Sequence, residues 1–203
     1  FYLDATPSHS YLHYLYKYPQ RESPYALMVD ENRRRTRQDP AFNLLDTGIF
    51  ADDRYWDVHV VYAKGEPRGI WIRISAYNRG PEVATFHLLP TLWFRNTWAW
   101  GDKVRKPRLF AAEPPPGAAW SVWAEHPDLG IYHLHGAQPS QLLFTENESH
   151  SERLWGTPAL GPFAKDAFHR YVINKEETAI NPKKVGTKCA AWYKVDVDSK
   201  SSA

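Results

Sequence analysis

Residues 55–77 have the sequence YWDVHVVYAKGEPRGIWIRISAY, and this stretch decides the fold class. From Tyr55 to Ala63 successive side chains alternate between two faces, as they do along an extended strand. Ile70 to Tyr77 alternates in the same way and places three isoleucines on one face. The segment 65–69 between them contains Gly and Pro, which is typical of a turn. The stretch therefore predicts an antiparallel β-hairpin.

Similar short segments, separated by turn residues, continue along the chain in both directions. We expect further strands at residues 1–3, 10–19, 42–47, 83–94, 118–126, 129–135, 141–146 and 187–197. The strand at 83–94 should add to the hairpin as a three-stranded meander, bent at Pro90. Ser23-Pro24 predicts a helix from about Pro24 to Arg35, and residues 161–171 predict a short helical turn. The fold class is therefore mainly β, an antiparallel two-sheet (super) β-sandwich with one or two short helices.

The 203 residues suit one large β domain, which we expect to span residues 1–197. Phe1-Tyr2-Leu3 has the character of a strand interior, so we expect the domain to be truncated at its start. Residues 198–203 are polar and predict a disordered tail.

Composition excludes several classes of function. A net charge of +2 gives no footprint for nucleic acid, and no apolar run is long enough to predict a membrane span. The one cysteine, Cys189, cannot form an internal disulfide, so we expect a cytoplasmic protein with a buried, inert thiol. Nucleotide-binding glycine motifs and nucleophile motifs are absent from the sequence, and we expect no cofactor.

Two groups of polar residues could in principle carry chemistry. His133 and His135 are two apart, a spacing that can chelate zinc, but no third ligand can be assigned and we predict no metal site. Four aspartates could supply paired carboxylates for glycoside hydrolysis, although Asp commonly caps turns, and we favour the turn interpretation. These aspartates are Asp46, Asp52, Asp53 and Asp57.

Residues 92–101 form the segment with the densest mixture of aromatic and polar side chains. Trp faces stack on sugar rings, and Arg and Asn side chains bind hydroxyl groups. A corner of the core, with the arginine paired to a carboxylate, would explain the same composition, and the sequence leaves both interpretations open. The candidate carbohydrate or interface residues are Trp93, Arg95, Asn96, Trp98 and Trp100.

Eight stretches, in order along the chain, resemble one family. They are Tyr2 to Tyr11, Leu15 to Gln20, Glu31 to Arg35, Leu44 to Phe50, Asp52 to Tyr55, Leu89 to Trp98, Leu143 to Glu148 and Gly186 to Lys188. Together they resemble glycoside hydrolase family 63-type glucosidases, the group that includes mannosylglycerate hydrolase-like members. The resemblance runs from the first residue to about Val197.

The resemblance implies an N-terminal β-sandwich that is joined, in such enzymes, to an (α/α)6 barrel. The acid and base carboxylates of the inverting mechanism lie in that barrel, so no catalytic residue is carried over to this chain. Trp93, Arg95, Asn96, Trp98 and Trp100 match a motif of the family, and their density and mixture of aromatic and polar side chains lead us to expect them near the domain interface or the rim of the sugar cleft.

We therefore expect a non-catalytic β-sandwich portion of a family 63-like α-glucosidase, which packs on a catalytic (α/α)6 barrel and helps to shape its sugar cleft. A free-standing carbohydrate-binding module and a hydrolase that uses the Asp46–Asp57 cluster are the alternatives. The expected partners are the barrel and an oligosaccharide or glucoside, with self-association through an exposed apolar face.

Overall fold

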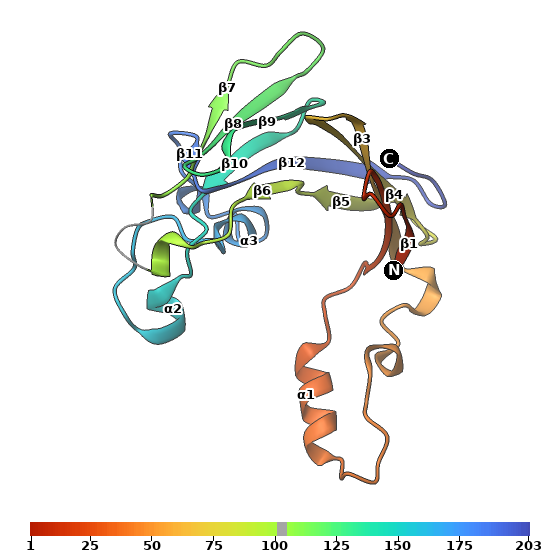
Figure 1. Ribbon diagram of the computed structural model, residues 1–203. Helices are drawn as coiled ribbons and strands as arrows, with labels where there is room; N and C mark the ends of the chain where they lie inside the picture. The colour runs from red at the N-terminus through yellow and green to blue at the C-terminus, as the bar shows by residue number, and fades with distance from the viewer. Residues whose placement is uncertain (101–104) are drawn as a thin grey trace. The chain divides into compact units, whose positions relative to one another are not determined.

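A computed structural model describes residues 1–100 and 105–203, except for the side chain of Trp100. Strands hold 40% of the residues and helices 17%, which confirms the mainly β class. The pairings β1–β2, β2–β3, β3–β4, β10–β12, β6–β12, β7–β11, β7–β8 and β8–β9 are antiparallel. The described strands form three four-stranded sheets, ordered β1-β2-β3-β4, β10-β12-β5 with β6 beside β12, and β11-β7-β8-β9 (Figure 1).

The chain divides into two compact units, whereas the sequence predicted one domain over 1–197. Unit 1 comprises Phe1–Phe86 and Val195–Ala203, and unit 2 comprises His87–Lys194. The division falls within two strands, β5 (Ala84–Leu88) and β12 (Lys188–Val197).

Unit 1 is built on the predicted hairpin. Strands β3 (Tyr55–Glu66) and β4 (Gly69–Asn78) pair with each other, and β2 (Tyr11–Pro19) and β1 (Tyr2–Ala5) extend the sheet from β3. One face carries an apolar side chain at nearly every position. At one end of this face, Trp56 is buried with its ring centroid 4.7 Å from that of Phe86. At the other end Ile70 is 66% exposed and Ile72 45% exposed, so part of the apolar face is uncovered.

The predicted helix is α1 (Tyr25–Arg34), and it buries none of its residues. Figure 1 shows it projecting, with the segment that follows it, from the strands of unit 1. The expected charge pairs form, with Arg33 3.8 Å from Asp30 and Arg34 3.4 Å from Glu31. The predicted cap was wrong, because Pro24 rather than Ser23 precedes the first helical residue and no side chain caps it.

The strand predicted at 42–47 is also wrong. Its last four residues form a 3-10 helix, η1 (Leu44–Thr47), and a second short one, η2 (Ala51–Asp53), follows. The Asn43 amide donates to Asp46 Oδ2 at 2.7 Å, and Thr47 Oγ1 donates to the Leu44 carbonyl at 2.6 Å. Short polar side chains thus bond the local backbone and favour a turn over a strand.

The predicted meander fails at its third strand, because β5 pairs with β12 rather than with β4. The buried Asn78 side chain redirects the chain. Its Nδ2 donates to the carbonyls of Glu82 at 2.7 Å and Val197 at 2.9 Å, and its Oδ1 accepts the Gly80 amide at 2.9 Å. These bonds fix a tight turn that leads away from β4.

The free edge of β4 is instead occupied by the polar C-terminal residues, for which the sequence predicted disorder. Ala76 and Ala203 exchange backbone hydrogen bonds of 2.9 and 3.0 Å, and the Asn78 amide donates to the Ser201 carbonyl at 2.9 Å. An edge strand presents unpaired backbone groups, and here residues 201–203 satisfy part of that edge.

Unit 2 contains two sheets packed face to face and a helical layer. Its strands are β6 (Thr91–Trp93), β7 (Arg108–Ala112), β8 (Trp120–His126), β9 (Gly130–Gly136), β10 (Gln141–Thr145) and β11 (Val185–Gly186), with most of β12. Its helices are η3 (Trp98–Trp100), α2 (Ser151–Trp155), α3 (Ala167–Val172) and η4 (Glu177–Ala179). Strands β8, β9, β10 and β12 lie where the sequence predicted them.

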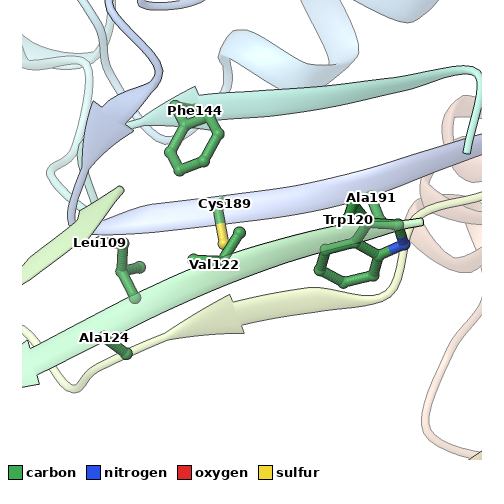
Figure 2. Close-up of a cluster of buried hydrophobic side chains, with 7 residues drawn as sticks. All are labelled: Leu109, Trp120, Val122, Ala124, Phe144, Cys189 and Ala191. Atoms are coloured by element: carbon green, nitrogen blue, oxygen red, sulfur yellow. The ribbon is translucent and has the colours of Figure 1, made fainter. Parts of the chain in front are cut away.

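Alternation along β10 and β12 builds two cores. Phe144 and Cys189 are cross-strand partners and face β7 and β8, where they pack with Leu109 and Val122 (Figure 2). The neighbouring pair, Leu143 and Ala190, faces the opposite way and packs against α3 and η4. The β10-β12 pair is therefore covered on both faces, as the inner layer of a sandwich is.

The Cys189 thiol should be inert in the folded protein. It is 2% exposed, and burial raises its pKa to about 12. Because the thiolate is the reactive species, native protein at pH 8 should react with 5,5′-dithiobis(2-nitrobenzoate) at most at its unfolding rate. Protein in guanidinium chloride should release one equivalent of chromophore at once. Native labelling as fast as that of the unfolded chain would contradict the buried position.

Candidate functional site

The segment predicted as the site begins on β6, which pairs with the start of β12 and sets Trp93 opposite Lys188. Strand alternation turns Leu92 and Phe94 toward the core of unit 2. The intervening Trp93 is consequently 54% exposed, and Arg95 is also exposed. Trp93 therefore offers an aromatic surface to solvent.

Asn96 lies beyond the strand and is hydrogen-bonded to Asn147. Its Nδ2 donates to the Asn147 carbonyl at 2.8 Å, and its Oδ1 accepts the Ala99 amide at 3.1 Å. Asn147 Nδ2 in turn donates to the Phe94 carbonyl at 2.9 Å. Both side-chain amides thus tie the 94–99 segment to the residues that follow β10.

The Trp98 indole contacts the first of several charged side chains that are bonded to one another. Its Nε1 donates to Glu148 Oε1 at 3.0 Å, and the same oxygen lies 2.8 Å from Lys106 Nζ. Lys106 Nζ also lies 3.0 Å from Glu146 Oε2, which accepts the Thr187 hydroxyl at 2.7 Å. We call this set the Trp98 cluster, and its members are Asn96, Trp98, Lys106, Glu146, Asn147, Glu148 and Thr187.

The contacts of the Trp98 cluster keep the Lys106 side chain charged. Burial lowers the pKa of Lys106, but its hydrogen bonds to Glu148 and Glu146 and their charges outweigh that effect and raise it above its ordinary value. The lysine therefore stays cationic at neutral pH. Glu148 is buried, and its Oε1 receives both the ammonium and the indole N–H. These contacts hold both carboxylates in place.

The structure unites only part of the predicted site. Asn96 and Trp98 belong to the Trp98 cluster, whereas Trp93 and Arg95 are exposed beside it. The side chain of Trp100 lies outside the described residues.

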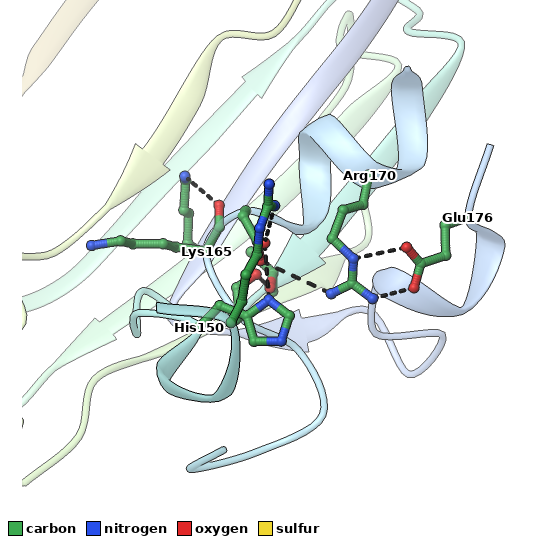
Figure 3. A network of polar contacts seen from close by, with 9 residues as sticks. His150, Lys165, Arg170 and Glu176 are labelled. Carbon is green, nitrogen blue, oxygen red and sulfur yellow. Dashed lines mark hydrogen bonds and ion pairs between the residues drawn. The ribbon is translucent and has the colours of Figure 1, made fainter. Parts of the chain in front are cut away.

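A second polar network is centred on Asp166, at the start of α3 (Figure 3). Its Oδ2 lies 3.0 Å from His150 Nδ1 and accepts Arg153 at 3.4 Å. Arg170 Nη1 lies 4.0 Å from Oδ1, and the Nε and Nη2 edge of the same guanidinium donates to both oxygens of Glu176. Burial raises the pKa of the Asp166 carboxyl, but His150 and Arg170 outweigh it and hold that pKa below the ordinary value. The network ties α2 to α3.

The other candidates from the sequence are dispersed. His133 and His135 are exposed on β9, and no group of three His, Cys, Asp or Glu among residues 1–100 and 105–203 could hold a metal ion. Asp46 bonds the turn backbone, as the favoured interpretation had it. Asp57 instead lies within β3, where Lys17 and Arg79 each bind it at 2.7 Å. Across the same residues no helix combines the length and apolar character that a membrane crossing requires.

The chain is 32% identical to the uncharacterized protein YMR196W of Saccharomyces cerevisiae. The alignment covers 95% of this chain but 21% of the yeast protein, so the chain spans about a fifth of its relative's length. No protein-family model matches the chain, and no solved structure matches it.

Sequence reasoning missed the charged half of the Trp98 cluster. Lys106, Glu146, Glu148 and Thr187 were not singled out as site residues. A signal for three of them was present, because the stretches 89–98, 143–148 and 186–188 were among those that resemble family 63. The structure brings the ends of these three stretches together in one cluster.

Proposed function

We propose that the chain is a non-catalytic, β-rich portion of a larger family 63-like glycoside hydrolase, in which it packs on a catalytic barrel and helps to shape the sugar cleft. The observation that carries this proposal is the Trp98 cluster. Three of the stretches that resemble one family meet there through direct side-chain contacts.

The bonding within the Trp98 cluster supports a structural rather than a catalytic role. Glu146 and Glu148 share the Lys106 ammonium, and each also accepts a second donor. Inverting glycosidases need one carboxylic acid that can give a proton and one carboxylate that can activate water. Glu146 and Glu148 are instead both bonded to one lysine, which supports a structural role.

The length of the yeast relative supports a larger parent protein, since the matched region is 21% of it. The uncovered part of the unit 1 sheet offers a surface for a partner domain. Around a shallow hollow lined by Leu12, Tyr14, Val60 and Tyr62, the side chains of Ile70 and Ile72 extend the apolar surface. Contiguous exposed apolar surface is typical of an interaction site.

A cytoplasmic location fits the single buried thiol and belongs to the same proposal.

The proposal is tested by two measurements on the purified 203-residue chain. First, it should not hydrolyse 4-nitrophenyl α-glucoside or α-mannoside. Second, it should self-associate in sedimentation velocity as its concentration rises, because the apolar face lacks its partner. Ile70→Lys should weaken that association, whereas Ile173→Lys should not, since Ile173 is equally exposed (68% against 66%) but lies on unit 2.

If the chain hydrolyses either 4-nitrophenyl glycoside and Glu148→Gln abolishes that activity, the non-catalytic assignment is overturned. A chain that stays monomeric at all concentrations, or one whose association is equally sensitive to Ile173→Lys, would contradict the use of the apolar face.

A free-standing carbohydrate-binding module is the second candidate, and the exposed indole of Trp93 favours it. In that case, titration with maltose should shift the Trp93 indole signal in a ¹⁵N-resolved spectrum, and Trp93→Ala should remove the response. The Trp98 indole, already bonded to Glu148, should stay unshifted. An unchanged Trp93 signal would exclude the sugar platform.

A further inference from the structure

The polar face of the unit 1 sheet contains a hollow of about 390 Å³, within the range of small-ligand sites. Strands β2, β3 and β4 all contribute to it, and register explains why. His59 stands opposite Ser75, and Arg73 stands opposite Val61, which itself faces His13. All of these side chains point to one face because they occupy alternate positions. Besides Ser75, the polar side chains used below are Tyr11, His13, His59, Arg73, Tyr77 and Arg79.

The hollow carries an excess of positive charge. Arg79 donates its Nε to Asp57 Oδ2 at 2.7 Å, and Lys17 binds the other oxygen of the same carboxylate at 2.7 Å. One carboxylate therefore faces two cations. Arg73 adds a third, and it makes no ion pair or hydrogen bond with the described residues. The lining includes no carboxylate of its own.

The other polar side chains of the hollow supply further donors. A hydrogen bond of 3.0 Å joins His13 Nε2 and His59 Nδ1. One of these two nitrogens donates and the other accepts, and the accepting ring must hold its proton on its far nitrogen, so that ring presents an N–H beyond the pair. The ring of Tyr77 packs edge-on against His59, with 5.6 Å between centroids. The hydroxyls of Tyr11 and Ser75 complete a rim that can bond polar ligand atoms.

We propose that this hollow binds a phosphate group, either free or carried by a small sugar, with Arg73 and Arg79 as the charged donors. Guanidinium groups match phosphate oxygens with two parallel N–H bonds. Arg79 uses its Nε on Asp57, which leaves the terminal nitrogens of its guanidinium for the ligand. The volume exceeds that of a bare ion, so the tyrosine, serine and histidine groups have room to bind sugar hydroxyls. This site lies in unit 1 and is independent of the Trp98 cluster and of the proposed hydrolase relationship.

The test is isothermal titration calorimetry on the full chain at low ionic strength with glucose 6-phosphate, inorganic phosphate and glucose. We expect the two phosphates to bind and glucose to give no heat. Tighter binding of glucose 6-phosphate identifies a sugar phosphate as the ligand, and equal affinity identifies free phosphate. Raising the salt concentration should weaken the binding, because the lining arginines are open to solvent.

Arg73→Gln should lower the affinity roughly tenfold or more, since a charge-assisted, bidentate contact is lost. Because Arg73 makes no bond within the described chain, the variant should fold normally, and its thermal midpoint checks this. Arg68→Gln is the matched control: Arg68 is exposed in the β3–β4 turn of the same hairpin and does not line the hollow. Absence of phosphate binding, unchanged affinity in Arg73→Gln, or equally tight binding of glucose would each overturn the proposal.

Discussion

Replacing Gly186 with alanine should unfold unit 2 or destabilise it by more than ~3 kcal/mol, since overpacking of this kind forces the backbone to move. A Cβ at this position would lie 2.2 Å from the Thr145 carbonyl oxygen and 2.9 Å from its carbon. Neither atom belongs to a flexible side chain, so strands β10 and β11 would have to separate. Separation would also strain the 3.1 Å hydrogen bond from the Thr187 amide to Thr145.

The measurement is equilibrium unfolding in urea, followed by tryptophan fluorescence and far-ultraviolet circular dichroism. Gly161→Ala is the matched control, because a Cβ added there would have no atom within 4 Å and the φ of Gly161 is not positive. That variant should change stability by less than ~1 kcal/mol, in either direction. Equal unfolding midpoints for the two variants would show that the close approach at Gly186 is not rigid.

Replacing Lys106 with methionine should destabilise the protein by about 2 kcal/mol. The substitution leaves Glu146 and Glu148 without their shared cation, and removal of one partner from a buried ion pair costs ~3–5 kcal/mol. We expect a loss of only about 2 kcal/mol, because 43% of the Lys106 side chain is exposed and water screens part of the charge. Lys183→Met, at an exposed lysine whose side chain has no ion pair with the described residues, is the control and should be neutral.

A double-mutant cycle separates the charge effect from the loss of the lysine stem. Glu148→Gln on top of Lys106→Met should recover part of the lost stability, because the remaining carboxylate would no longer be buried beside a second one. If the two effects simply add, the ion pair does not couple these residues and the account of the Trp98 cluster fails.

The sequence predicted the regular strands well because their side-chain alternation is a local property. Strands β3, β4, β8, β9, β10 and β12 each carry it, and each was found. Two of the errors fall where polar side chains bond the nearby backbone. Asp46 and Thr47 turned a predicted strand into η1, and Asn78 turned the chain away from the expected meander.

Only part of the candidate site was predicted, because the contacts that complete it are not local in the sequence. Composition identified the aromatic segment around Trp98, but its partners Glu148 and Thr187 lie about 50 and 90 positions later, and no local pattern joins them. Pairing across such separations depends on which strands become neighbours. The phosphate hollow was missed entirely, since each of its strands contributes only a few polar residues and each of these looks ordinary in its own segment.

The position of residues 195–203 has a consequence for synthesis on the ribosome. Most of unit 1 precedes unit 2 in the chain, yet Asn78 bonds Val197 across 119 positions and Ala76 pairs with Ala203. Unit 2 is a single continuous segment, His87–Lys194, and its strands are all synthesised before that partner segment leaves the exit tunnel. The β4 edge of unit 1 therefore stays unpaired until all of unit 2 has been synthesised. During that interval the nascent chain exposes a template for strand addition, so the β4 edge depends on prompt synthesis of residues 195–203.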